Sequence, residues 1–210
     1  MLVGFWNGLP SDVMDALTVR DFKGRCEIRP GPEYLLRNYQ FTKSRFHLLQ
    51  YYYLDDMCTV PAFSVFAWGH YFFRRPSMVV PGGMDVDYDL RGVDIMAYKN
   101  GVVDSLRHKI NRSCPGHLKS RWRTYKKYRL YGYTATREQS DQQDIDCLAG
   151  LHLTFNELQL MRVEYRKKLH RGHRQRKKSI ELFLGDIHTQ VHRRAYYRPT
   201  RYQPPLSKQR

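Results

Sequence analysis

The sequence predicts a mainly α-helical protein with one membrane-spanning helix. Three observations support this fold class. A run of 17 residues between Asp56 and Arg74 carries no formal charge, apolar residues recur at helical spacing in residues 34–53 and 151–169, and all of the net positive charge lies in the second half of the chain. The expected order is therefore an amphipathic helix, one transmembrane helix, and a helical basic extramembrane extension with an irregular tail.

The charge of the chain is divided unevenly between its halves. The 210 residues carry 36 Lys+Arg and 20 Asp+Glu, a formal net charge of +16. Residues 1–100 hold 11 basic and 11 acidic side chains, whereas residues 101–210 hold 25 and 9. Such a chain meets polyanions with its basic half, either nucleic-acid phosphate or anionic lipid headgroups. A solvated, solubilising surface is the alternative, although the excess is larger than the roughly 2–8 charges that solubility needs.

Residues 1–33 are expected to form an N-terminal segment. Ser11 can cap a short helix over residues 12–19, and Pro30 and Pro32 predict a turn around Gly31. The first basic residue is Arg20, so these residues fit neither a secretory leader nor a cleaved mitochondrial one. The protein is therefore expected to be made where it works or to be imported on internal signals.

Residues 34–75 are expected to form an amphipathic helix followed by the transmembrane helix. The uncharged run spans ~25 Å as a helix, at the lower end of the ~17–25 residues that cross a bilayer. Tyrosines precede it, Trp68 lies within it, and Arg74 and Arg75 follow it, as interfacial anchors do. Because His70 lies inside the run and acids adjoin it, a core helix or strand of a soluble protein remains the alternative.

The remaining chain is predicted in three parts. Residues 76–150 form a loop-rich basic and aromatic extension with one short helix between Gly92 and Pro115. Residues 151–185 form a second amphipathic helix, because Thr154 and Glu157 make a T-x-x-E capping box before an apolar stripe. Residues 186–210 form an extended basic tail, since prolines at its end exclude regular helix.

No constellation predicts catalysis, a cofactor or a bound metal ion. The four cysteines lie 32, 56 and 33 residues apart, and the Cys114–His117 pair alone is too little for a zinc site. The acidic residues 85–89 lack the glycine and glutamate of a calcium loop, and no phosphate-binding glycine motif or nucleophile motif is present. The cysteines are therefore interpreted as reduced and buried, and the protein as not an enzyme.

The basic and aromatic run at residues 121–137 is the strongest candidate contact surface. Its arginines and lysines can neutralise phosphates while its tyrosines and tryptophan stack on unpaired bases. The same side chains also suit anionic lipid or a protein surface, and composition does not separate these three partners. The residues predicted to contact lipid or a partner are Trp68, Arg74, Arg75, Arg121, Trp122, Arg123, Lys126, Lys127 and Arg129.

Residues 9–75 resemble subunit f, an accessory subunit of the mitochondrial ATP synthase membrane region. The likeness lies in LPS (residues 9–11), RDF (residues 20–22), the Arg- and Tyr-rich stretch at residues 34–53, and the uncharged run that ends at Arg74 and Arg75. The resemblance implies a non-catalytic subunit of the mitochondrial inner membrane that braces the stator region. Its implied partners are cardiolipin or another anionic lipid and neighbouring subunits of the complex.

The alternative function comes from another class of protein. A mitochondrial ribosomal protein also combines an ordered part with a basic part threaded into folded RNA, and here residues 101–210 would bind rRNA. The two functions make different predictions, since the first requires a span embedded in lipid and the second requires RNA along the arginines.

Overall fold

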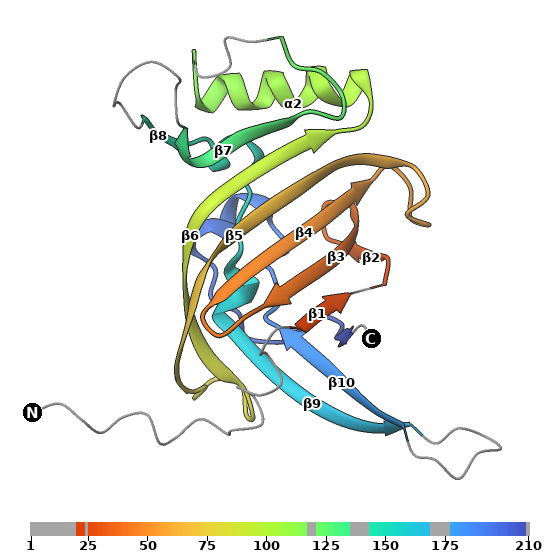
Figure 1. Ribbon diagram of the computed structural model, residues 1–210, viewed down its shortest axis with the longest axis vertical. Helices are drawn as coiled ribbons and strands as arrows, with labels where there is room; N and C mark the ends of the chain where they lie inside the picture. Colours follow the sequence, from red (N-terminus) through yellow and green to blue (C-terminus); the bar gives the residue numbers. More distant parts are fainter. Residues whose placement is uncertain (1–19, 24, 117–120, 135–142, 169–176, 209–210) are drawn as a thin grey trace, which may run out of the picture.

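The structure is a computed structural model, which describes residues 20–23, 25–116, 121–134, 143–168 and 177–208. It is a strongly curled antiparallel sheet with one α-helix across its upper end (Figure 1). The predicted mainly α-helical fold is therefore wrong, and no helix in the described ranges is long and apolar enough to cross a membrane. The elements are β1 (Arg20–Lys23), β2 (Glu27–Arg29), β3 (Glu33–Phe41), β4 (Arg45–Tyr53), β5 (Pro61–Pro76), β6 (Met84–Ala97), α2 (Asn100–Ser113), β7 (Lys127–Thr134), β8 (Gln143–Asp146), η1 (Leu148–Leu151), η2 (Asn156–Gln159), β9 (Leu160–Lys168), β10 (Lys177–Leu184), η3 (Val191–Tyr196) and β11 (Leu206–Lys208).

The strand pairings run around the molecule and return to their starting point. They follow the order β5, β4, β3, β1, β11, β10, β9 and β6, and β6 also pairs along β5. The pairings of β1 with β11 and of β6 with β9 span two residue pairs each, whereas β5 and β6 pair along most of their length. The sheet curls because its strands carry the ordinary right-handed twist. The long β5 and β6 strands form one side of the curl, and the short pairings close the other side.

Residues 34–75 form three successive antiparallel strands instead of two helices. Along β4 every second side chain is buried, which is the period of a strand with one face against a core. The uncharged run contains most of β5: Val65 and Ala67 point into the core, while Phe66 and Trp68 lie on the outer face. Because β5 carries apolar side chains on both faces, the composition of this run is the same as that of a membrane-spanning helix.

Residues 76–150 contain more regular structure than the predicted loops. The long β5–β6 hairpin turns at residues 77–83, and β6 continues to Ala97, where a helix was expected to have begun. Helix α2 starts only at Asn100 and packs on the sheet through Val103, Leu106 and Ile110. The predicted helix and α2 overlap because both follow the same apolar spacing.

Residues 151–185 also differ from the predicted helix. Thr154 and Glu157 do not cap an α-helix, because Glu157 belongs to the short 3-10 turn η2 and its side chain is fully buried in the core. Strands β9 and β10 follow as an antiparallel hairpin. The tail is not irregular either. Its 3-10 turn η3 packs beside η2, where the Asn156 amide donates to the Arg194 carbonyl at 2.7 Å. Strand β11 then joins the sheet by pairing with β10. The helix expected at residues 12–19 lies outside the described residues.

A network of polar side chains lies inside the curl. Tyr39 donates a hydrogen bond to Glu157 Oε1 at 2.9 Å, and Gln50 Nε2 donates to the same oxygen at 2.9 Å. Tyr52 donates to Gln50 Oε1 at 2.9 Å, and Arg29 lies 3.8 Å from Glu157. Burial raises the pKa of the Tyr39 and Tyr52 hydroxyls far above the ordinary value. A buried carboxylate is tolerated here because donors and a guanidinium surround it.

All four cysteines are joined in two disulfides, which overturns the interpretation that they are reduced. Cys26 pairs with Cys58, which ties β2 to the β4–β5 loop, and Cys114 pairs with Cys147, which ties the end of α2 to the start of η1. The Cα atoms lie 5.9 and 5.6 Å apart, as disulfide geometry requires. The spacings in the sequence could not identify these pairs.

Candidate polyanion-binding surface

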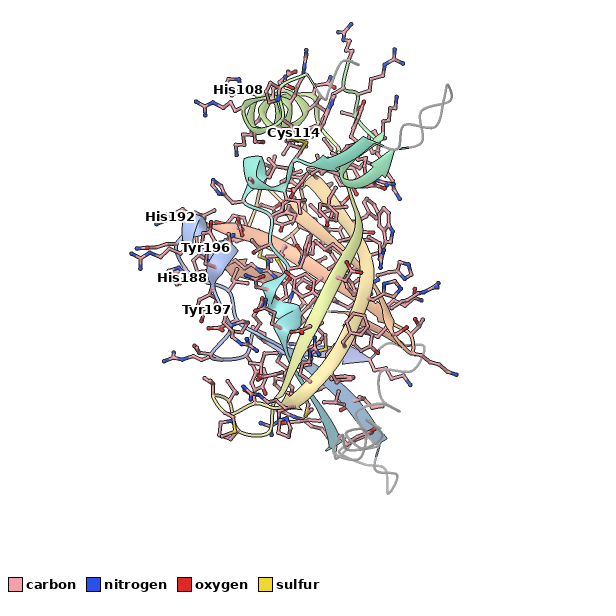
Figure 2. The ribbon with its side chains drawn as sticks, turned by 90° about the vertical axis from the view of Figure 1, so that its left-hand side faces the viewer. His108, Cys114, His188, His192, Tyr196 and Tyr197 are labelled. Carbon is pink, nitrogen blue, oxygen red and sulfur yellow. A yellow bond between two sulfur atoms is a disulfide. The ribbon has the colours of Figure 1, made fainter. Side chains whose placement is uncertain are left out.

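The upper end of the molecule is built by α2, which presents one apolar and one basic face. Three apolar residues at helical spacing turn toward the sheet, so the intervening residues face solvent. Arg107, His108, Lys109 and Arg112 are all exposed. In Figure 2, His108 lies on the outer side of α2, and side chains with nitrogen tips project from this end of the molecule.

The segment that precedes β7 places further cations beside α2. Trp122 is buried and stacks on Tyr128 with ring centroids 4.2 Å apart, and the Arg123 amide donates to the Tyr128 hydroxyl at 2.7 Å. These contacts fix the backbone, so Arg121 and Arg123 on either side of Trp122 are exposed. Lys126 lies 5.6 Å from the Tyr128 ring centroid and is also exposed. In this segment Trp122 is an anchor and not a surface residue.

The predicted contact residues Trp68, Lys127 and Arg129 lie together on the outer face of the sheet. The Arg129 guanidinium lies 4.8 Å from the Trp68 ring centroid and pairs with Asp94. Lys127 Nζ lies 3.9 Å from the Phe66 ring centroid, beside a shallow groove of about 410 Å³. The cationic groups are therefore held by neighbouring aromatic rings.

The predicted residues Arg74 and Arg75 lie at the other end of the β5–β6 hairpin, away from α2. Arg74 pairs with Asp87, and Arg75 lies 3.7 Å from Asp85. The structure thus divides the predicted set. One group lies at the α2 end and contains Arg121, Arg123 and Lys126. A second group lies on the outer face of the sheet and contains Trp68, Lys127 and Arg129. The charges of Arg74 and Arg75 are balanced by carboxylates at the far end of the β5–β6 hairpin.

Ion pairing distinguishes the α2 end from the rest of the molecule. Between residues 99 and 127 the sequence has nine Lys and Arg and one carboxylate, Asp104. Within the described part of the chain, no cation at residues 99–126 has a carboxylate oxygen within 4.0 Å. Elsewhere in the described ranges, ten arginines pair with carboxylates: Arg29, Arg37, Arg74, Arg75, Arg91, Arg129, Arg162, Arg166, Arg194 and Arg198.

A groove continues the basic surface between α2 and η1. Its volume is about 480 Å³, and Lys109, Arg112 and His152 line it together with apolar side chains. The disulfide between Cys114 and Cys147 holds the two sides of this groove together. Sequence analysis missed His152 and the basic residues of α2, although the spacing of Arg107, Lys109 and Arg112 beside an apolar stripe was a signal that could have found them.

The described residues offer no alternative site of metal chemistry. Nowhere in these ranges do three or more His, Cys, Asp or Glu side chains gather in a group that could hold a metal ion. The cysteine and histidine spacing at Cys114 has no such role, because the Cys114 sulfur is bonded to Cys147.

The chain matches a protein-family model over nearly its whole length. Residues 14–210 match the family model described as adenomatosis polyposis coli down-regulated 1, APCDDC. The chain belongs to the APCDDC family. This membership overturns the resemblance to ATP synthase subunit f, and with it the stator role and the mitochondrial inner-membrane location. The mitochondrial ribosomal alternative also has no support in an APCDDC chain with a β-rich fold.

Proposed function

We propose that this APCDDC chain is a non-enzymatic binding domain of the secretory pathway or cell exterior, and that its α2 end binds a sulfated glycosaminoglycan. The observation that carries the proposal is the contrast in ion pairing, because the α2 end concentrates cations without carboxylate partners. Among the other residues whose side chains the structure describes, cations without a carboxylate partner, such as Lys43 and Arg45 at the β3–β4 turn, occur in ones and twos.

The two disulfides support the compartment. Disulfides form and persist in oxidising environments such as the secretory pathway and the cell surface, and are rare in the cytosol and nucleus. In those compartments sulfated polysaccharides present dense, regularly repeated negative charge. Exposed, long Lys and Arg side chains suit such a ligand, since they adapt to successive sulfates and release counterions on contact.

The burial of the aromatic residues argues against single-stranded RNA. Base stacking requires an open aromatic face, but Trp122 and Tyr128 are only 5% and 7% exposed and cover each other. Tyr125, 71% exposed, is the exposed aromatic residue of the segment before β7. The apolar face of α2 is likewise used for packing, so the helix lacks the free apolar face with which interfacial helices enter a membrane.

Retention on immobilised heparin tests the proposal. The parent protein is expected to bind and to elute at a salt concentration above that of the triple variant Arg107→Ser, Lys109→Ser and Arg112→Ser. The matched control removes three unpaired cations elsewhere, Lys43, Arg45 and Arg193, by the same substitution. The slope of log affinity against log salt should fall in the α2 variant and much less in the control.

Three outcomes contradict the proposal. The first is equal elution of the α2 variant and its matched control, since that result assigns retention to net charge alone. The second is binding to fully desulfated heparin that equals binding to heparin. The third is tighter binding to single-stranded RNA or to phosphatidylserine vesicles than to heparin at the same ionic strength.

A further inference from the structure

The sequence contains one acceptor motif for N-linked glycosylation, and it lies in α2. Asparagine is an acceptor in the secretory pathway when it is followed by any residue except proline and then by serine or threonine. Five asparagines occur in the chain, and only Asn111 meets this condition, through Arg112 and Ser113. The motif occupies the last turn of the helix, directly before the disulfide-bonded Cys114.

The fold leaves the side chain of Asn111 available for a glycan. Asn111 is half-buried, and within the described ranges no hydrogen bond holds its side-chain amide. Asn156 differs, because it is 8% exposed and its amide donates to the Arg194 carbonyl at 2.7 Å. The amide of Asn111 can therefore carry a sugar without the loss of a native hydrogen bond.

One flank of α2 consists of Arg107, His108 and Asn111, and we call it the outer flank. Residues three and four apart on a helix are neighbours, so Asn111 lies beside both of the other residues. The side chains of Arg107 and His108 are exposed, and Figure 2 shows His108 on the outer side of the helix. A glycan is bulky and hydrophilic, so a glycan on Asn111 would cover these two side chains.

The other flank of α2 faces η1 and lines the groove of about 480 Å³. This groove flank consists of Lys109, Arg112 and Ser113, and the described lining of the groove contains none of the outer-flank residues. At 100° per residue, Lys109 and Asn111 point about 160° apart around the helix axis. A glycan on Asn111 therefore leads away from Lys109 and leaves the groove open.

We infer that Asn111 carries an N-linked glycan, which covers the outer flank and confines the sulfated polysaccharide to the groove flank. In the transfer, the Asn111 amide nitrogen forms a bond to the anomeric carbon of the first N-acetylglucosamine of a lipid-linked oligosaccharide. The bond from that carbon to the lipid diphosphate breaks, the diphosphate leaves with the bonding electrons, and the amide nitrogen gives up one proton. The glycan rests on the secretory compartment that the disulfides support, and the confinement rests also on the proposed polysaccharide function.

Mass spectrometry of the protein secreted by insect cells behind a signal peptide tests the glycan. The parent protein is expected to lose the mass of one glycan on treatment with peptide-N-glycosidase F, which leaves aspartate at residue 111. Asn111→Gln and Ser113→Ala should each abolish this mass and the response to the enzyme. Asn100→Gln is the matched control, since it changes another asparagine of the same helix and should keep the glycan.

The affinity for heparin, with and without the glycan, tests the confinement. In the glycosylated protein, Lys109→Ser should weaken binding severalfold, whereas Arg107→Ser should weaken it less than about twofold, because the glycan keeps heparin from the outer flank. In the Asn111→Gln background, Arg107→Ser should weaken binding about as much as Lys109→Ser. Each substitution removes one cation, so net charge does not explain a difference between them. If Asn111→Gln fails to fold, Ser113→Ala provides the same background.

Each part of the inference has a result that overturns it. An unmodified Asn111 in the secreted parent protein removes the glycan, whatever the affinity for heparin. Equal effects of Arg107→Ser and Lys109→Ser in the glycosylated protein remove the confinement. A protein that binds no heparin with or without the glycan contradicts the proposed function and the confinement together, while the mass measurement decides the glycan independently.

Discussion

Tyr39 and Glu157, which lie 118 residues apart in the sequence, are joined by a hydrogen bond of 2.9 Å inside the curl of the sheet. Glu157 is fully buried, and the nearest guanidinium is that of Arg29 at 3.8 Å. The bond therefore connects β3 to η2 and fixes how the last third of the chain packs into the concave side. It also makes the fold sensitive to a single charge.

The substitution Glu157→Gln tests this sensitivity. It keeps the shape of the side chain but leaves Arg29 without its buried counter-charge, so the free energy of unfolding should fall by about 3–5 kcal/mol. Tyr39→Phe removes one hydrogen bond and should cost only about 1–2 kcal/mol. Urea denaturation followed by circular dichroism measures both variants, and equal losses would show that the charge is not what matters.

Alkaline pH should destabilise the protein through its buried tyrosines. Desolvation raises the pKa of Tyr71 from 10.0 to about 12, and the unfolded chain keeps the ordinary value. Above pH 10 the unfolded state releases the phenolic proton while the folded state retains it, so stability falls as the pH rises toward 12. Denaturation midpoints between pH 9 and 12 measure this loss, and the fall should be shallower in Tyr71→Phe.

Removal of either disulfide should destabilise the fold by a similar amount. The bonds close loops of nearly equal length, with separations of 32 and 33 residues, so each is expected to contribute about 3–4 kcal/mol. Paired Cys→Ser variants at residues 26 and 58 or at residues 114 and 147 separate the two contributions in a urea titration. Only the second pair should lower heparin retention, because it holds α2 in place.

The contact between Trp68 and Gly92 predicts a coupled pair of substitutions. A Cβ atom at residue 92 would lie 2.0 Å from the indole ring, so Gly92→Ala must displace Trp68 and should cost about 1–3 kcal/mol. In a Trp68→Ala background the same substitution should cost much less. Equal costs in the two backgrounds would contradict the contact, and tryptophan fluorescence reports the displacement independently.

The sequence shows that residues 57–73 are apolar, but it does not show that most of them form a β-strand and not a helix. Both faces of β5 carry apolar side chains, so the period of two that marks a strand is weak there. The alternation of polar and apolar side chains in residues 45–48 and the Pro81–Gly83 turn were available signals for a strand and a hairpin. The pairings of β1 with β11 and of β6 with β9 depend on distant contacts that local propensity does not encode.

The candidate surface was partly accessible to sequence reasoning. Composition located the excess of cations in the second half, and the run at residues 121–137 contains Arg121, Arg123 and Lys126 of the α2 end. The exposure of each side chain could not be inferred from the sequence. Trp122 and Lys126 lie in the same basic and aromatic run, yet Trp122 is buried and Lys126 is exposed. The disulfides were equally hidden, since four separated cysteines allow three pairings.

The pairing of β1 with β11 has a consequence for biosynthesis. Ser207 and Lys208 pair with residues 22 and 23, so the earliest and latest described strands complete each other. During translation the edge of β1 has no strand partner until residues 207 and 208 have emerged from the ribosome. A nonsense codon before residue 206 would leave that edge open in the nascent product, and an unpaired strand edge is a template for aggregation.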